Sequence, residues 1–345
     1  TGKLYINEGT YPTLSEVILR DNPTISERTD FSVTNTANTT GTVYKTNKTE
    51  DGSDVYYYSG NTSKNWVKFA GFYWRIIRTN EDKSVRLLYA GTTHDTTTGY
   101  IETSVYNSTN NDPMYVGYMY GTSGSLANNR TNTNDSAIKT VIDAWYKNNL
   151  LTNYDKYISK TAIYCNDRST QNNSYSTSSR FSYGASTRLD TNKTPTYKCG
   201  GDGNGGLFES TQAIADKFSA STTGGGNGKL TYPIALMTAD EIAFAGGLKT
   251  ISLNSPYAWY YTNSQGESIT GDNWWWSLSP VVWSGSDAFM WGVGSSVNPG
   301  RLNVSGYVQD GGGVRPSISL NSCVKVSGTG TPDDPYDADY ENSCK

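Results

Sequence analysis

The residue types that most often carry chemistry are scarce in this sequence. His94 is the only histidine, and it lies in the Thr-rich segment GTTHDTTTG. A Ser-His-Asp or Cys-His nucleophilic site would have to use this residue, yet no G-x-S-x-G nucleophile motif accompanies it. The sequence also lacks the clusters of histidine and cysteine that ligate metals. We therefore predict no catalytic residue, no metal and no cofactor, and we interpret His94 as a solvated loop residue.

Carboxylates offer two further kinds of chemistry. The acidic segment TPDDPYDADYENSC could supply oxygen ligands to calcium, but it lacks EF-hand spacing, and a solvated acidic end is the simpler interpretation. The candidate ligands are Asp333, Asp334, Asp337 and Asp339. The two carboxylates of a glycosidase can come from distant positions, so a glycan hydrolase stays open as a minor alternative. Asp240 and Glu241 are better interpreted as first-turn helix residues that interact with the helix dipole.

The four cysteines indicate disulfides rather than a metal site. They have no C-x-x-C spacing, and free buried thiols are the alternative. We predict the pairs Cys165–Cys199 and Cys323–Cys344, because each closes a moderate loop around a Gly/Thr/Asn-rich segment. Disulfides persist in oxidising compartments, so we expect an extracellular or cell-surface location. The first residue is Thr1 rather than methionine, which is what a trimmed, mature product would show.

Composition and charge exclude two classes of partner. Hydrophobic residues make up 35% of the 345 residues and charged residues only 17%, while Thr, Ser, Asn, Gly and 27 tyrosines supply the polar balance. The formal charge of -4 leaves no basic stripe that could neutralise phosphates, so nucleic acid is not expected as a partner. Since the sequence has no run of about 18 apolar residues, no membrane span is expected in this chain either.

The elements that would position a site begin with a short helix. Thr13 and Glu16 have capping-box spacing, and Leu14, Val17 and Ile18 fall on one helical face. We predict that residues 1–63 form an N-terminal helix and an irregular extension. This extension ends in the tyrosine-rich strand of TEDGSDVYYYSG.

Residues 64–345 are predicted to form the main domain around a central antiparallel hairpin. The hairpin reads WVKFAGFYWRIIR, then the polar turn TNEDKS, then VRLLYAG. Because both faces of the first run are largely apolar, we interpret it as one central strand that is covered on two sides.

Helical and loop signals follow the hairpin. Ile138, Val141, Ile142 and Trp145 have helical spacing behind a cap at Asn134 or Asp135. Residues 166–228 are Ser/Thr/Asn/Gly-rich and indicate long surface loops. The segment TYPIALMTADEIAFAGG predicts a short strand, a second capping box and a short helix that ends at its glycines. Helices and strands are interspersed without regular βαβ alternation, which favours an α+β fold.

The stretch NWWWSLSPVVWSGSDAFMWG is the most unusual part of the sequence. Trp274, Trp275 and Trp276 are consecutive, so in a strand they cannot all face one side. The following Gly-rich segment, residues 281–308, carries further large side chains. We interpret it as a loop in which the glycines provide tight turns and present the large residues, and the alternative is a Gly-rich loop that folds onto its own domain.

Several motifs together resemble a known family. NWWWSLSP followed by GVRPSISL resembles the W-W-x-x-S-P and G-V-R-P motifs of a Gram-positive surface protein family of unassigned function. The resemblance extends upstream through VKFAGFYWRIIRTNEDKSVRLLYAG, NDPMYVGYMYG, CNDRS, KTPTYKC and YPIALMTADEIAFAGG, and so covers most of the chain from about residue 40. That family is similar in turn to C-type-lectin-like domains of the formylglycine-generating type, including the variable proteins of diversity-generating retroelements.

The resemblance implies a fold and a ligand-binding face. It implies a C-type-lectin-like mixed fold with a few short helices and long loops, in which Arg315 holds a buried polar contact. In the retroelement proteins the stretch before the final strand binds the ligand. The enzymes of this fold use a close pair of cysteines, whereas Cys323 and Cys344 lie far apart in this sequence.

We therefore expect a recognition protein without catalytic activity. Its partner would be a protein or glycan ligand on another cell or surface, and it would contact segment 281–308. A structural subunit that self-associates in a surface filament or layer is the alternative. Aromatic and arginine side chains among serine and asparagine are also typical of paratopes. The expected anchors are Trp283, Phe289, Trp291, Arg301 and Tyr307, and the expected polar contacts are Ser284, Ser286, Asp287, Asn298 and Asn303.

Overall fold

The computed structural model describes residues 11–38, 40–199, 216–221, 227–249, 251–253 and 258–345. These residues form mixed sheets with a few short helices, which confirms the α+β class. None of the helices in these ranges combines the length and the apolar character that a bilayer span requires.

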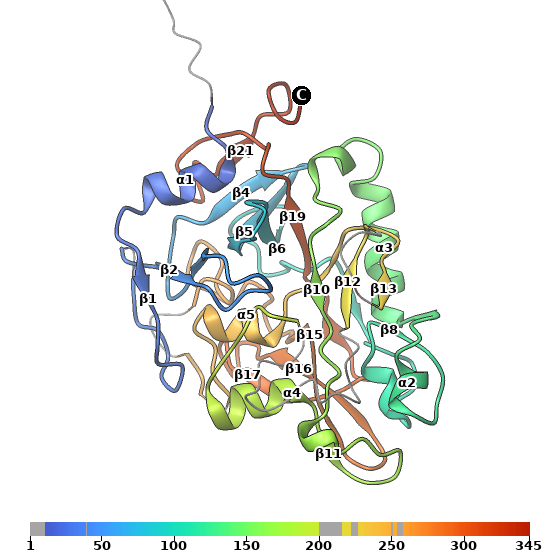
Figure 1. Cartoon of the computed structure of the whole chain (residues 1–345). Helices are drawn as coiled ribbons and strands as arrows, with labels where there is room; N and C mark the ends of the chain where they lie inside the picture. Colours follow the sequence, from blue (N-terminus) through green and yellow to red (C-terminus); the bar gives the residue numbers. More distant parts are fainter. Residues whose placement is uncertain (1–10, 39, 200–215, 222–226, 250, 254–257) are drawn as a thin grey trace, which may run out of the picture.

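The larger sheet has ten strands (Figure 1). Its main path runs β1-β2-β3-β5-β4-β21-β20, and β6, β19 and β14 continue from β5. The strands are β1 (Ser26–Glu27), β2 (Val43–Thr46), β3 (Val55–Tyr58), β4 (Trp66–Phe69), β5 (Phe72–Thr79), β6 (Val85–Gly91), β14 (Ala235–Leu236), β19 (Pro316–Leu320), β20 (Val326–Ser327) and β21 (Tyr336–Ala338). β2 and β3, from the predicted N-terminal extension, thus belong to the same sheet as the predicted central hairpin.

The central run differs from its prediction in one respect. Ala70 and Gly71 adopt φ of 56° and 81°, so a two-residue turn divides the expected single strand into β4 and β5. Phe69 and Phe72 are opposite each other across this turn. β5 then pairs with β6, and both strands are buried along most of their length, as the apolar character of both faces predicts.

The second sheet has six strands and contains the tryptophan stretch. Its order is β17-β16-β15-β18-β7, and β11 pairs with β15. The strands are β7 (Thr103–Ser104), β11 (Phe181–Ser182), β15 (Trp275–Trp283), β16 (Ala288–Val293), β17 (Leu302–Tyr307) and β18 (Gly312–Gly313). Segment 281–308, expected as a loop, is therefore largely a three-stranded antiparallel meander. Register shifts interrupt the pairing of β15 with β16 and of β16 with β17.

Two smaller sheets complete the strands that the structure describes. One contains β10 (Tyr164–Cys165), β12 (Lys217–Ser219) and β13 (Gly228–Lys229). The other pairs β8 (Met119–Tyr120) with β9 (Asn134–Asp135).

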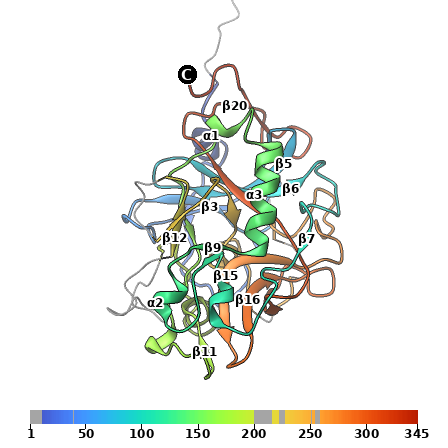
Figure 2. The ribbon, with the colours of Figure 1, turned by 90° about the vertical axis from the view of Figure 1, so that its right-hand side faces the viewer.

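The α-helices are short, and their N-termini follow local sequence signals. They are α1 (Leu14–Asp21), α2 (Leu126–Asn129), α3 (Ala137–Asn149), α4 (Gly184–Ser186) and α5 (Ala239–Phe244). The predicted capping boxes are confirmed, with Thr13 and Glu16 at α1 and Thr238 and Glu241 at α5. The cap of α3 is Ser136 instead of the expected Asn134 or Asp135, because its hydroxyl accepts the Lys139 N–H. α3 runs along one side of the molecule (Figure 2).

Short helical turns and one π-helical segment connect these elements. The 3₁₀ turns are η1 (Pro113–Val116), η2 (Asp155–Tyr157) and η3 (Gln171–Asn173), and the π-helical segment is η4 (Thr187–Asn192).

The region predicted as surface loops is partly a buried polar layer. Residues 166–170 are buried, and Arg168 donates to both carboxylate oxygens of Asp216, at 2.8 and 2.9 Å. Arg130 lies 3.2 Å from the same carboxylate, and the Asn227 amide donates to it at 2.6 Å. Burial on its own would raise the pKa of Asp216, but the two guanidinium groups outweigh it and lower the pKa to about 2.

Both predicted disulfides are present. Cys165–Cys199 joins Cα atoms 5.4 Å apart, and Cys323–Cys344 joins Cα atoms 4.9 Å apart. The second disulfide lies beside a contact between the two ends of the described chain, where the Leu14 N–H donates to the Val324 carbonyl at 2.9 Å. Figure 1 shows the C-terminus near α1 and β21, with β11 at the opposite end of the molecule.

Trp274 and Trp276 lie on one face of the sheet, where both contact the positions of Gly306 and Gly312, and Trp275 lies on the other, as strand alternation requires. Trp275 and Trp276 are buried in the core, whereas Trp274 is half-buried. Arg315 is buried, and its guanidinium lies 4.8 Å from the Trp275 ring and donates to the carbonyls of Tyr89 and Tyr260. The expected buried polar contact of Arg315 is thus confirmed. Burial lowers the pKa of Arg315 to about 9.

Candidate functional site

Two of the five predicted anchor residues are not on the surface. Trp283 and Trp291 are 1% and 0% exposed, so the expectation that both face outward is corrected. Trp283 pairs with Phe181 of β11, which covers this end of β15. Both indoles belong to the main hydrophobic core, so they are packed within the molecule.

The other predicted anchors remain accessible to different degrees. Phe289 and Tyr307 face each other across β16 and β17, with ring centroids 4.3 Å apart, and Tyr307 is 42% exposed. Arg301 is half-buried, and it donates to the Asn298 side chain at 3.4 Å. Tyr307 therefore offers the largest apolar surface among the predicted anchors.

The predicted polar residues of the β15–β16 turn stabilise the turn itself. The Ser284 hydroxyl accepts the Asp287 N–H at 2.9 Å, and the Ser286 hydroxyl donates to the Asp287 carboxylate at 2.5 Å. The Asn110 amide holds the other oxygen of Asp287 at 2.8 Å. These contacts fix the tip of the hairpin, where Ser286 is exposed.

A groove that the sequence analysis missed lies on the same sheet, and we call it the Trp274 groove. It has a volume of about 120 Å³ and is lined by Trp274, Gly292, Asn303, Gly306 and Asp310. The Asp310 carboxylate accepts the Tyr307 N–H at 3.0 Å. The groove thus combines a half-buried indole with an amide and a carboxylate.

Glycines allow the Trp274 indole to lie against the sheet. A Cβ atom added at Gly292, Gly306 or Gly312 would lie 2.8, 3.0 or 2.9 Å from an atom of this indole. Such distances are shorter than side chains normally tolerate, so each of these positions excludes a larger residue unless the indole moves. The glycines that the sequence analysis assigned to loop turns therefore serve, in part, to admit one ring.

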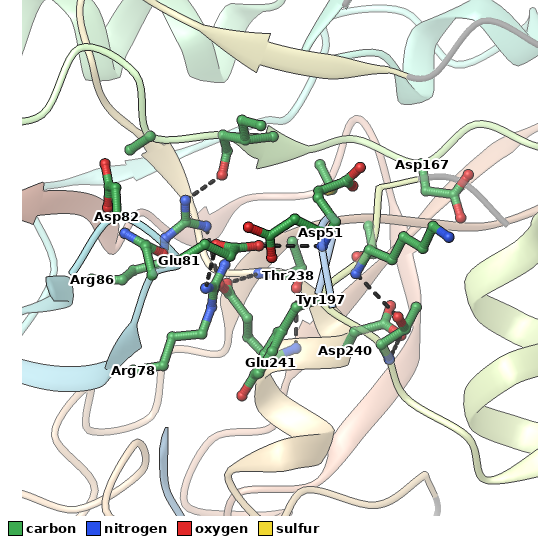
Figure 3. A pocket seen from close by; sticks show the side chains of 18 of the residues that line it. Asp51, Arg78, Glu81, Asp82, Arg86, Asp167, Tyr197, Thr238, Asp240 and Glu241 are labelled. Carbon is green, nitrogen blue, oxygen red and sulfur yellow. Dashed lines mark hydrogen bonds and ion pairs between the residues drawn. The ribbon is translucent and has the colours of Figure 1, made fainter. Parts of the chain in front are cut away.

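We call a second hollow the charged cavity (Figure 3). It has a volume of about 280 Å³. Its lining residues come from β5, β6, β10, β15, α5, η4 and the loops beside them. The charged residues that line it are Glu50, Asp51, Arg78, Glu81, Asp82, Arg86, Asp167, Arg188, Lys198, Asp240 and Glu241.

One side of the charged cavity has two guanidinium groups that share one carboxylate. Arg78 and Arg86 contact the same oxygen of Glu241, at 3.2 and 3.0 Å, and all three side chains are buried. Burial raises the pKa of the Glu241 carboxyl, but Arg86 and Arg78 outweigh it, so the pKa is lowered overall. Glu241 was predicted as a helix-dipole residue. It does complete the capping box, and it also anchors these two arginines.

On the other side of the charged cavity, two carboxylates share one guanidinium group. Arg188 donates to both oxygens of Asp240, at 3.0 and 2.9 Å, and to Asp167 at 2.7 Å. Burial lowers the pKa of Arg188, yet Asp240 and Asp167 outweigh it and raise the pKa overall. Figure 3 shows Arg78, Arg86 and Glu241 on one side of the cavity, with Asp167 and Asp240 on the other.

One group of candidate metal ligands borders the charged cavity. The Glu50 carboxylate and the sulfurs of Cys165 and Cys199 lie within 4.8 Å of one another. These two sulfurs are joined to each other, and disulfide sulfur lacks the thiolate charge with which cysteine binds metals. Glu50 instead lies 2.5 Å from the Lys217 ammonium group.

His94 has contacts that explain its position without a catalytic role. Its Nδ1 lies 2.7 Å from the Ser264 hydroxyl, and its Nε2 lies 3.7 Å from Asp333, whose side chain is 92% exposed. The imidazole also lies edge-on to Trp66 and Tyr73. His94 is thus less solvated than predicted.

Comparison with known proteins gave no match to a family model, to a curated protein or to a solved structure.

Proposed function

We propose that this protein is a recognition module, extracellular or at the cell surface, that binds a glycan through the Trp274 groove and the neighbouring strands β16 and β17. The proposal includes the expected C-type-lectin-like architecture and the absence of catalysis. The observation that carries it is the half-buried indole of Trp274, which lines the groove together with Asn303 and Asp310.

The chemistry of the groove suits a sugar ring. The face of an indole packs against the apolar C–H face of a pyranose. Asn303 and Asp310 supply amide and carboxylate groups, and these can donate to and accept from hydroxyl groups. A volume of about 120 Å³ is enough for one ring rather than a long chain.

A glycan hydrolase finds less support in the same groove. Retaining and inverting glycosidases both need two carboxylates across the scissile bond. Asp310 is the one carboxylate among the described residues that line the groove. Binding without hydrolysis is therefore the function that the groove supports best.

A glycan array followed by calorimetric titration of the best ligand tests this proposal. Trp274→Ala should weaken binding by about 2 kcal/mol or more, because it removes the stacking surface. Trp274→Phe should retain part of the affinity. Val297→Ala changes an 80% exposed side chain outside the groove and should leave binding unchanged. Equal affinities for wild type and Trp274→Ala would refute the role of the groove.

A structural subunit remains a second candidate because of the position of β17. Among the described strands, β17 pairs only with β16; Lys249 bridges its outer side at Leu302, and Tyr307 is exposed at its other end. Edge strands can pair with another chain. Electron micrographs that show polymers, lost in Tyr307→Lys but kept in Trp274→Ala, would favour this candidate over glycan recognition.

A further inference from the structure

Two buried hydrogen-bond donors that line the charged cavity have no partner in the part of the chain that the structure describes. Arg86 uses both terminal nitrogens, for Glu241 and for the Ile163 carbonyl, but its Nε has no partner among the described residues. The Tyr197 hydroxyl also has none. Arg86 is 1% and Tyr197 is 6% exposed, and both residues line the cavity. Buried polar groups in native proteins are almost always hydrogen-bonded, so these two donors indicate an acceptor inside the cavity.

The Tyr197 hydroxyl remains a donor throughout the physiological pH range. Burial raises the pKa of Tyr197 well above its usual value, although the neighbouring Arg78 opposes this. The Arg78 guanidinium lies 4.3 Å from the Tyr197 ring and holds the ring in place. The acceptor is thus expected next to a guanidinium and a phenol, which together suit a carboxylate.

The total charge of the cavity argues against a ligand that carries only negative charge. Four basic and seven acidic side chains line it, a formal balance of -3. The acidic excess lies toward the solvent, because Asp51 and Asp82 are exposed and Glu81 is partly exposed, whereas Glu241, Asp240 and Asp167 are buried. A ligand that enters past these carboxylates gains from carrying a positive charge.

We propose that the charged cavity binds a small zwitterion of the α-amino-acid class. The ligand carboxylate accepts hydrogen bonds from Arg86 Nε and the Tyr197 hydroxyl, and its ammonium group faces Glu81 and Asp82. A volume of about 280 Å³ is near the lower end for ligand pockets, which agrees with a ligand of this size. This site is separate from the Trp274 groove, because the two hollows share no lining residue.

Calorimetric titration of the intact protein with the standard L-amino acids tests the proposal. L-Lysine is the leading probe, because its additional ammonium group matches the acidic excess. Cadaverine, which is lysine without the carboxylate, serves as the matched comparison. We expect cadaverine to bind about 10- to 100-fold more weakly than L-lysine, since it cannot accept the two charge-assisted hydrogen bonds.

Two variants separate the roles of the donors and the acidic side chains. Tyr197→Phe removes only the unpartnered hydroxyl and should weaken L-lysine about tenfold, while leaving cadaverine unchanged. Glu81→Gln keeps an oxygen that can accept the hydrogen bond from the Glu50 N–H, which is 3.2 Å long in the wild type. Because it removes a negative charge, it should weaken the binding of both probes. Tyr11→Phe makes the same change at an exposed position outside the cavity and should alter neither affinity.

The results that would overturn the proposal are distinct. The cavity does not bind amino acids if none of them gives a binding isotherm. The carboxylate assignment fails if L-lysine and cadaverine bind equally, or if Tyr197→Phe binds L-lysine as wild type does. Trp274→Ala should bind L-lysine normally, so a failure of the glycan proposal leaves this test unaffected.

Discussion

Replacing Asp216 with asparagine should lower the free energy of unfolding. It should also remove part of the pH dependence of this free energy. Asp216→Asn keeps the shape of the side chain but takes away the negative charge between Arg168 and Arg130. Removing one partner from a buried ion pair costs about 3–5 kcal/mol, because the remaining charge stays buried. We therefore expect the free energy of unfolding to fall by about that amount at pH 6, where the wild-type carboxylate is ionised.

The pH dependence follows from the lowered pKa of Asp216. The folded state holds this pKa at about 2, below the usual value of 3.8, so the folded protein binds fewer protons than the unfolded chain in this range. The resulting stability is complete above about pH 4 and is lost as the pH falls toward about 2. At 1.36 kcal/mol for each pH unit, the effect is roughly 2 kcal/mol.

Urea denaturation of both proteins between about pH 6 and about pH 2 measures this effect. The difference in unfolding free energy between wild type and Asp216→Asn should shrink by roughly 2 kcal/mol over this interval, because the other carboxylates contribute to both proteins. A carbon NMR titration of wild type should place the Asp216 midpoint near 2. A midpoint near 4, or a difference that stays constant with pH, would refute the reasoning.

Three further predictions concern other features of the structure. Removing either disulfide should lower the free energy of unfolding by roughly 3 kcal/mol, and non-reducing peptide mapping that finds free thiols or crossed pairs would contradict the assignment. Gly306→Ala should destabilise the fold by about 1–3 kcal/mol in thermal denaturation, since its Cβ would lie 2.8 Å from the Trp276 ring. His94→Ala should change stability by less than about 1 kcal/mol, because its nearest carboxylate is exposed, and it should leave ligand binding intact. Loss of an activity in a folded His94→Ala protein would contradict the absence of catalysis.

Local features of the fold could be predicted from the sequence because their causes are local. The capping boxes at Thr13 and Thr238 each depend on a glutamate three residues away. The alternation at Trp274 to Trp276 follows from strand geometry alone. The turn at Ala70 was missed, because alanine rarely adopts a positive φ and no turn residue precedes it.

Features that depend on contacts between segments far apart in the sequence could not be predicted. Trp283 is paired with Phe181 of β11, which comes some 100 residues earlier in the chain. The charged cavity depends on pairs such as Arg78 and Glu241, which are 163 residues apart, and nothing in either segment indicates the other. The Trp274 groove had a partial signal in the sequence. One of three consecutive tryptophans had to face away from the core, but only the register shows which glycines lie beneath it.

The Cys323–Cys344 disulfide gives the molecule a short path for mechanical force. Tension applied between the two ends of the described chain would pass from Cys344 through the disulfide to Cys323. From there it would reach Leu14 through the Val324 carbonyl. β20 and β21 lie within the loop that the disulfide closes, and the β15–β16 turn lies at the far end of the molecule (Figure 1). Tension applied to both ends would therefore act on the end of the molecule that contains the disulfide. The strands next to the Trp274 groove would keep their register under this tension.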